Sequence, residues 1–220
     1  MLCHELPRDP GAAEAIDRTY PWLADRLAQE SGWRVILPTL RGAGGSAGEF
    51  SALGWLADLR FLVAHEAQQA VQVCAVGFGL GGALALRLAA DEERVVGVGS
   101  LGAPADLAAW VGDASAFLQR CRDSGVVRSA GFPPDLSSWV DELVGLDPVQ
   151  AAGSLAGRPL LIVHGTDDAE VPAQAARGLA EAAARSGSTV DLRVVPGAGH
   201  WLRADPRVVA TLIGWLERHQ

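Results

Sequence analysis

Two polar, glycine-bounded loops carry the side chains best suited to proton transfer. One loop reads HGTDDAEVP and contains Asp167 and Asp168, and the other reads PGAGHW and contains His200. Each loop follows a short apolar run of the kind that forms a buried strand. A carboxylate on one loop can orient a histidine on the next, so that the histidine acts as a general base. The sequence therefore predicts a catalytic acid–histidine pair built from one of these aspartates and His200.

A glycine-rich junction, GFGLGG over residues 77–82, follows the apolar run 71–77 and leads into the helical stretch ALALRLAA. The spacing of Gly77, Gly79 and Gly82 fits G-x-G-x-x-G, whose glycines let the backbone approach a pyrophosphate. The same junction fits a nucleophile elbow, a tight turn that presents one side chain to an active site. Under the second hypothesis the position of the nucleophile is Gly79, with Gly77 and Gly81 as the small flanking residues.

The next strand argues against dinucleotide binding. That hypothesis requires an acidic residue near the end of the strand, but the run 95–101 ends in VGSL, and the acidic residues 91–93 come before it. The elbow hypothesis agrees instead with the order of the three features along the chain, which is nucleophile position, acid and histidine.

These loops require a framework of alternating strands and helices. We expect strands at about 1–4, 33–38, 71–77, 95–101, 159–164 and 190–195, and helices at about 12–30, 53–69, 80–90, 172–186 and 205–218. The strand candidates are apolar without strict alternation, as in parallel sheets covered on both faces. The alternation predicts an α/β fold in a single domain, 1–220, with a doubly wound, mostly parallel sheet of about six strands. Residues 104–157 contain no expected strand and are too long for a normal crossover, so we expect a small helical insertion there.

On these motifs the chain resembles the α/β-hydrolase superfamily over most of its length. HGTDDAEVP is similar to the acid loop HGxxDxxVP of that superfamily, which implies Asp168 as the acid, and PGAGH is similar to its histidine loop, which implies His200 as the base. RGAGGSAG at 41–48 looks like the loop RGxGxSxG, and HELP at 4–7 is similar to the oxyanion loop HGxP. The resemblance implies a serine/cysteine esterase type of activity on carboxylic esters or lactones.

The resemblance also implies further parts of the site. The backbone N–H groups of Leu6 and Leu80 are expected to form the oxyanion hole. The insertion 104–157 is expected to lie as a cap over the site. Candidate pocket residues are His4, Glu5, Phe78, Trp139 and Trp201. For His4 a structural role is the more common one in such loops.

Three features depart from the family pattern. Gly79 stands where the family has Ser, Cys or Asp, and because glycine has no side chain it excludes covalent catalysis at this position. Glu5 replaces the usual glycine of the oxyanion loop. A glutamate after the histidine of this loop resembles the sequence of dienelactone hydrolases, whereas the 41–48 loop is more like that of esterases. Met1 lies at or inside the first expected strand. Either the hairpin that usually precedes this strand is absent, leaving 33–38 as an edge, or the natural chain begins upstream.

Three hypotheses for function follow. The first is a nucleophile-deficient hydrolase, or pseudoenzyme, that binds an ester-like or lactone-like small molecule. The second is a hydrolase or lyase in which His200 and Asp168 activate water, and the third is a non-catalytic binding protein or scaffold. No cofactor and no metal are expected, because the five histidines show no ligand spacing.

Composition limits the partners. The 220 residues include 26 acidic and 18 basic ones, giving a net charge of −8, which disfavours nucleic acid and anionic membranes as partners. All the basic residues are arginine, so a P-loop lysine and a Schiff-base lysine are excluded. The three cysteines are widely spaced, and no secretory leader or apolar span is apparent. We therefore expect a cytoplasmic protein that is a monomer or homodimer.

Overall fold

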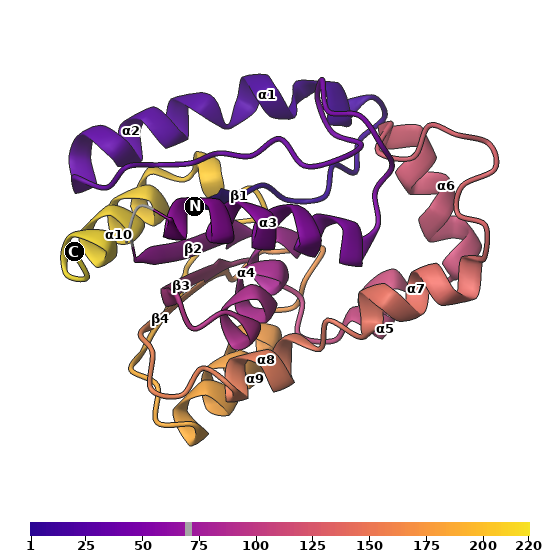
Figure 1. Ribbon diagram of the computed structural model, residues 1–220. Coiled ribbons are helices and arrows are strands. Elements are labelled where there is room, and N and C mark those ends of the chain that lie inside the picture. Colours follow the sequence, from indigo (N-terminus) through magenta and orange to yellow (C-terminus); the bar gives the residue numbers. More distant parts are fainter. Residues whose placement is uncertain (69–71) are drawn as a thin grey trace.

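A five-stranded, all-parallel sheet forms the centre of the computed structural model, which describes residues 1–68 and 72–220 (Figure 1). The strands lie in the order β1 (Leu2–Cys3), β2 (Val73–Phe78), β3 (Val95–Leu101), β4 (Leu160–Gly165) and β5 (Val190–Val195). Every residue of β2 and β4 is buried, as expected of strands covered on both faces. The predicted α/β class with a parallel sheet is confirmed. The predicted start of the second of these strands at 71, and the predicted helix end at 69, lie outside the described residues.

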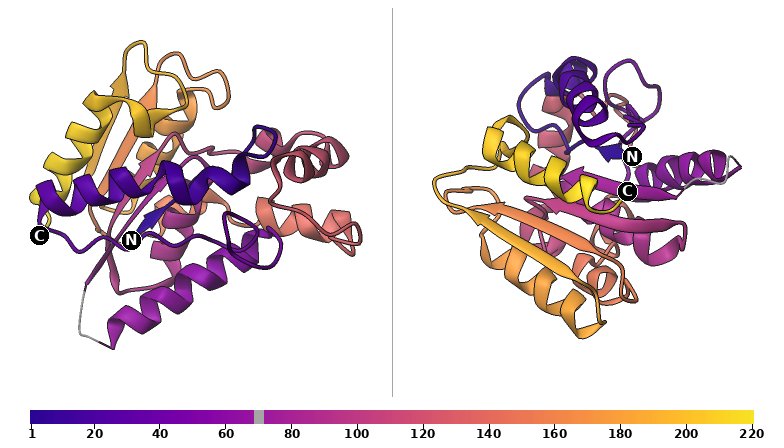
Figure 2. Two further views of the ribbon diagram at one scale, coloured as in Figure 1. Left: turned by 90° about the horizontal axis from the view of Figure 1, so that it is seen from above. Right: turned by 90° about the vertical axis from the view of Figure 1, so that its left-hand side faces the viewer.

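Helices cover both faces of this sheet. They are η1 (Ala12–Ala15), α1 (Ile16–Thr19), α2 (Pro21–Ser31), α3 (Ala52–Ala67), α4 (Leu80–Asp91), α9 (Gln174–Arg185), the short η2 (Leu202–Ala204) and α10 (Pro206–Glu217). Figures 1 and 2 show α2 and α10 side by side on one face, with α3, α4 and α9 on the other. The buried side chains accordingly form two apolar clusters, one on each side of the sheet. No helix in the described ranges has both the length and the apolar character needed to cross a membrane.

Local sequence signals explain where several helices begin and end. The carboxylate of Asp205 accepts a hydrogen bond from the Arg207 N–H at 2.9 Å, and Pro206 occupies the first turn of α10, as the sequence predicts. Helix α2 ends at Gly32, whose φ of 73° is a left-handed conformation that favours glycine. Such caps satisfy backbone groups that have no partner inside the helix.

The predicted insertion 104–157 contains four short helices, α5 (Leu107–Val111), α6 (Ala114–Ser124), α7 (Leu136–Val144) and α8 (Pro148–Gly153). Helices α5 to α7 lie to one side of the sheet and share an aromatic core in which Phe117 contacts Trp110 and Trp139 (Figure 1). Helix α8 instead packs against α4 and α9, so it belongs to the helical layer on the sheet.

The segment 33–38 is not a strand, so the expectation of about six strands is wrong by one. It runs beside β1 and makes one backbone hydrogen bond to it, from the Leu2 N–H to the Ile36 carbonyl at 2.8 Å. Because β1 is only two residues long, it offers too few backbone groups for a continuous ladder. The sheet therefore ends at β1 on this side, and β5 forms the opposite edge. The side chain of Trp33 is held elsewhere, since its indole N–H donates to the Leu216 carbonyl of α10 at 3.0 Å.

Candidate active site

The candidate site lies where the chain leaves the carboxyl ends of the strands. His4 and Glu5 follow β1, Gly79 follows β2, the loop 166–171 follows β4, and His200 comes in the loop after β5. Parallel strands bring these loops to the same edge of the sheet, which is where open α/β sheets bind ligands. Residues that are far apart in sequence therefore meet at this edge.

A hydrogen bond joins Asp168 and His200. The Nδ1–H of His200 donates to Oδ2 of Asp168 at 2.8 Å, and the Asp168 side chain is fully buried. Oδ1 of Asp168 accepts hydrogen bonds from the backbone N–H groups of Glu170 and Val171, each at 2.9 Å. With Nδ1 bound in this way, Nε2 of His200 is the nitrogen left to exchange protons with a ligand. Asp167 instead accepts a hydrogen bond from the Thr166 hydroxyl and is exposed.

These contacts shift both ionisation equilibria. Burial alone would raise the pKa of Asp168, but hydrogen bonds from His164, His200 and the Val171 backbone lower it far below the usual range. Burial alone would lower the pKa of His200, but the hydrogen bond to Asp168 and the negative charges of Glu170, Asp168 and Glu5 raise it. Asp168 is therefore a carboxylate at neutral pH, and the imidazolium form of His200 persists to higher pH than in a free histidine.

Gly79 occupies the turn between β2 and α4 with φ of 52° and ψ of −125°. A side chain at this position would place its Cβ 3.4 Å from Nε2 of His200 and 3.2 Å from Cβ of Glu5. A hydroxyl or thiol on that Cβ comes within hydrogen-bonding reach of Nε2, which is the relation between nucleophile and base in covalent catalysis. A positive φ at a strand-to-helix turn is the kind of strained backbone that a nucleophile elbow requires, and glycine itself supplies no nucleophile.

The loop after β1, which is predicted to supply an oxyanion donor, is held by the fully buried His4. Its Nδ1–H donates to the Glu5 carbonyl at 2.9 Å, and its Nε2 accepts the Leu40 N–H at 3.2 Å. The Glu5 carbonyl and the Leu6 N–H belong to one planar trans peptide, so fixing the carbonyl also fixes the opposite direction of the N–H. Within residues 1–68 and 72–220, neither the Leu6 nor the Leu80 N–H donates a hydrogen bond to the protein.

We expect His4 to make the protein less stable in mild acid. Burial lowers the pKa of His4 from its ordinary 6.5 to about 4. Between these pH values the unfolded chain binds a proton that the folded chain does not, so the free energy of unfolding falls as pH decreases from 6.5 to 4. The loss attributable to His4 over this window is on the order of 3 kcal/mol.

Urea denaturation of the parent protein and His4→Gln across this window measures that contribution. Glutamine keeps an acceptor and a donor but does not titrate, so its stability curve is expected to be the flatter of the two. Parallel curves would show that His4 titrates normally in the folded protein.

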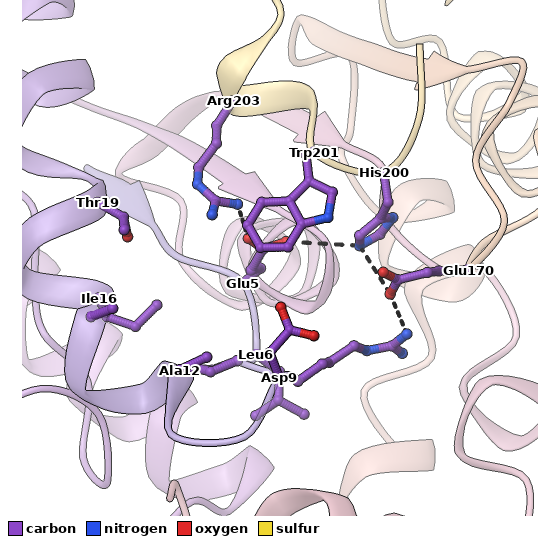
Figure 3. A pocket seen from close by; sticks show the side chains of 13 residues that line it. Glu5, Leu6, Asp9, Ala12, Ile16, Thr19, Glu170, His200, Trp201 and Arg203 are labelled. Atoms are coloured by element: carbon purple, nitrogen blue, oxygen red, sulfur yellow. Dashed lines mark hydrogen bonds and ion pairs between the residues drawn. The ribbon is translucent and has the colours of Figure 1, made fainter. Parts of the chain in front are cut away.

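A cavity of about 190 Å³ opens in front of these groups (Figure 3). One wall is mainly apolar and includes Leu6, Ala12 and Ile16, while His200 and Glu5 line the other. Pockets for drug-sized ligands measure about 300–1,000 Å³, so this one suits a smaller molecule. No residue of 104–157, a range that the structure describes throughout, lines the cavity. The expected cap therefore lies beside the site, where Trp110 stacks under the guanidinium of Arg8 at 4.5 Å.

Two arginine–glutamate pairs flank His200 (Figure 3). Arg203 pairs with Glu5, and Arg8 pairs with Glu170. Oε2 of Glu5 lies 3.8 Å from Nε2 of His200, and Oε2 of Glu170 lies 3.7 Å from it. Burial raises the pKa of Glu5 in spite of the opposing charge of Arg203. Nε2 of His200 is thus placed between two carboxylates.

Only some of the predicted pocket residues line this cavity. Glu5 and Trp201 do, and the Trp201 side chain is exposed at the mouth. His4 is enclosed by the hydrogen bonds described above, Phe78 packs edge-on against Tyr20 beneath the site, and Trp139 is buried in the insertion with its N–H on the Phe50 carbonyl. These three side chains are buried in the core and do not line the cavity.

Several residues of the site were not predicted from the sequence, among them three charged residues and one glycine. Arg8, Glu170 and Arg203 line the cavity, and Gly102 would bring a Cβ within 3.6 Å of the His200 ring, so it leaves room for that ring. Three of the four lie within or just beyond a recognised motif, since Arg8 follows HELP, Glu170 belongs to HGTDDAEVP and Arg203 comes three residues after His200. Proximity in sequence to these motifs is the available signal for those three, whereas Gly102 belongs to no recognised motif.

The chain belongs to the alpha/beta hydrolase family, whose model matches residues 11–212. A search of curated proteins finds no matching relative. The fold and the arrangement of loops at the sheet edge agree with this membership.

Solved structures show the same fold at low sequence identity. A monoacylglycerol lipase of Paleococcus ferrophilus is 17% identical, with a TM-score of 0.68 and coverage of 100% of this chain and 93% of the lipase. The meta-cleavage product hydrolase CumD of Pseudomonas fluorescens, a mutant complexed with acetates, is 20% identical, with a TM-score of 0.68 and coverage of 100% and 90%. Est1E of Butyrivibrio proteoclasticus, with ferulic acid bound, is 14% identical, with a TM-score of 0.67 and coverage of 99% and 86%.

Proposed function

We propose that this protein carries a carboxylic ester or lactone hydrolase site whose covalent nucleophile is missing. In this site Asp168 orients His200, the backbone N–H groups of Leu6 and Leu80 stabilise the oxyanion, and Gly79 occupies the position of the nucleophile. The observation that carries the proposal is the 3.4 Å between Nε2 of His200 and a Cβ at Gly79. Hydrolysis is then slow, because the oxyanion hole and positioning alone give about 10³-fold to 10⁴-fold over water.

The cavity and the structural neighbours support an ester-like small molecule as substrate. The cavity of about 190 Å³ has an apolar wall for an acyl or alkyl group and a polar wall for the reacting carbonyl. The neighbours include a lipase, a meta-cleavage product hydrolase and a protein with ferulic acid bound. The retained Asp168–His200 pair favours a catalytic site over a plain scaffold, since a scaffold does not need a buried, fully hydrogen-bonded acid.

Covalent labelling tests the proposal. A fluorophosphonate reacts with a serine only where a base and an oxyanion hole activate it. We expect Gly79→Ser to gain the mass of one phosphonyl group, whereas the parent protein and Gly79→Ser/His200→Ala remain unlabelled. Mass spectrometry of the intact proteins measures this. A folded Gly79→Ser protein that stays unlabelled would contradict the proposed site.

A further inference from the structure

Glu5 is the side chain nearest to the space that a nucleophile at Gly79 would fill. A Cβ at Gly79 would lie 3.2 Å from Cβ of Glu5, 3.4 Å from Nε2 of His200 and 3.8 Å from Oε2 of Glu5. Glu5 and His200 both line the cavity, and Oε2 of Glu5 lies 3.8 Å from Nε2 of His200. A water molecule in the cavity can therefore contact a proton acceptor and a proton donor at the same time.

We propose that Glu5 is a catalytic residue whose carboxylate takes a proton from a water molecule beside Gly79, so that this water attacks the bound ester or lactone directly. This inference rests on the proposed function, because it takes the same substrate class and the same oxyanion hole. It assigns the residual hydrolysis to a base other than His200.

Glu5 and His200 together account for each proton that moves in the reaction. The water oxygen bonds to the carbonyl carbon while one water proton passes to Glu5, and the resulting oxyanion is stabilised by backbone N–H groups. The bond from carbon to the leaving oxygen then breaks as Nε2–H of His200 gives its proton to that oxygen. The products are a carboxylic acid and an alcohol, or one hydroxy acid from a lactone. The proton on Glu5 returns to Nε2 of His200, 3.8 Å away, through the next water.

The charges around His200 favour its role as the acid. Asp168, Glu170 and Glu5 face the imidazole ring, and together they raise its pKa above the ordinary 6.5. His200 is therefore protonated over a wider pH range than a free histidine. A protonated histidine cannot take a proton from water, but it can donate one to a leaving group.

The surroundings of Glu5 suit a base. Burial raises its pKa above the ordinary 4.5, and the charge of Glu170 acts in the same direction. The positive charges of Arg203, His200 and Arg8 oppose the rise and keep the ionised form accessible. The Glu5 N–H also donates to the Tyr20 hydroxyl at 3.1 Å, which fixes the backbone of this residue. A carboxylate with a raised pKa accepts a proton from water more readily than an ordinary one.

The test is the pH profile of ethyl acetate hydrolysis, followed in a pH-stat. Ethoxide is a poor enough leaving group to require a proton. For the parent protein we expect a bell-shaped pH profile, in which the rate of hydrolysis rises as Glu5 ionises and falls as His200 loses its proton. In Gly79→Ser the rate is expected to rise through the His200 transition instead, because serine attack needs a neutral histidine.

Two substitutions test whether Glu5 acts as a base or only as a negative charge near His200. Glu5→Gln is expected to lower the parent rate at its optimum by at least about 10²-fold. Glu170→Gln removes a carboxylate equally close to His200, at 3.7 Å, but no Glu170 atom lies within 3.8 Å of a Cβ at Gly79. It is expected to move both limbs to lower pH while keeping the bell-shaped profile, because Glu170 raises the pKa of both Glu5 and His200. Added formate is expected to restore activity to Glu5→Ala, because formate can replace the lost carboxylate.

The outcomes distinguish this inference from the proposed function. An active Gly79→Ser beside a parent protein that is inert at every pH would overturn the role of Glu5 and leave the proposed function standing. A parent rate that rises through the His200 transition, or that survives Glu5→Gln, would also overturn it. Absence of activity from both folded proteins would contradict the proposed function itself.

Discussion

Replacing Gly79 by serine is expected to raise the rate of hydrolysis of short p-nitrophenyl esters by at least about 10³-fold. Loss of the nucleophile from an intact triad costs about 10⁶-fold in kcat, and the other parts of the site are in place here. Asp168 binds Nδ1 of His200 at 2.8 Å, and the new Cβ lies 3.4 Å from Nε2. Steady-state kinetics on purified parent and Gly79→Ser protein measures the gain.

The substitution has a cost in stability that must be measured separately. The φ of 52° at Gly79 disfavours any side chain, and the new Cβ would come 3.2 Å from Cβ of Glu5. Strain at such a position costs about 1–3 kcal/mol. Thermal unfolding of Gly79→Ser shows whether the variant is folded at the assay temperature. Gly79→Ala has the same backbone strain without a hydroxyl, and its rate is expected to remain at or below that of the parent protein.

Replacing Asp168 by asparagine in the Gly79→Ser background is expected to lower kcat by about 10³-fold to 10⁴-fold. The asparagine oxygen can still accept the hydrogen bonds from the backbone N–H groups of Glu170 and Val171. The amide NH2 then faces Nδ1 of His200. Nδ1 must then accept, so the ring proton moves to Nε2, and Nε2 loses the lone pair that would take the serine proton. Kinetics at a pH where His200 is neutral measures the loss.

Asp167→Asn is the matched control for this prediction. Asp167 is adjacent in sequence and is exposed, and its carboxylate accepts a hydrogen bond from the Thr166 hydroxyl at 2.7 Å rather than from His200. The control is expected to keep kcat within about threefold, as is usual for surface substitutions away from such networks. Equal losses in both variants would mean that the loop, rather than the acid, had been disturbed.

The sequence by itself predicted the framework. Strands covered on both faces are continuously apolar, which makes β2, β3 and β4 visible as short runs. Asp205 with Pro206 marks the start of α10 through local hydrogen bonding and fixed backbone angles. The prediction of a strand at 33–38 is wrong, because strand formation also depends on a partner, and the neighbouring strand β1 is only two residues long.

The motifs likewise predicted the contact between Asp168 and His200 and the turn at Gly79, because each belongs to a loop that follows a parallel strand. The tertiary structure alone decided what surrounds them. It places Glu5 and Glu170 on either side of Nε2 of His200, with Arg203 and Arg8 as their partners, and it buries Trp139 away from the cavity. The reason is physical: motifs arise from backbone conformation along a few consecutive residues, whereas the charges that face a histidine depend on how separate loops pack together.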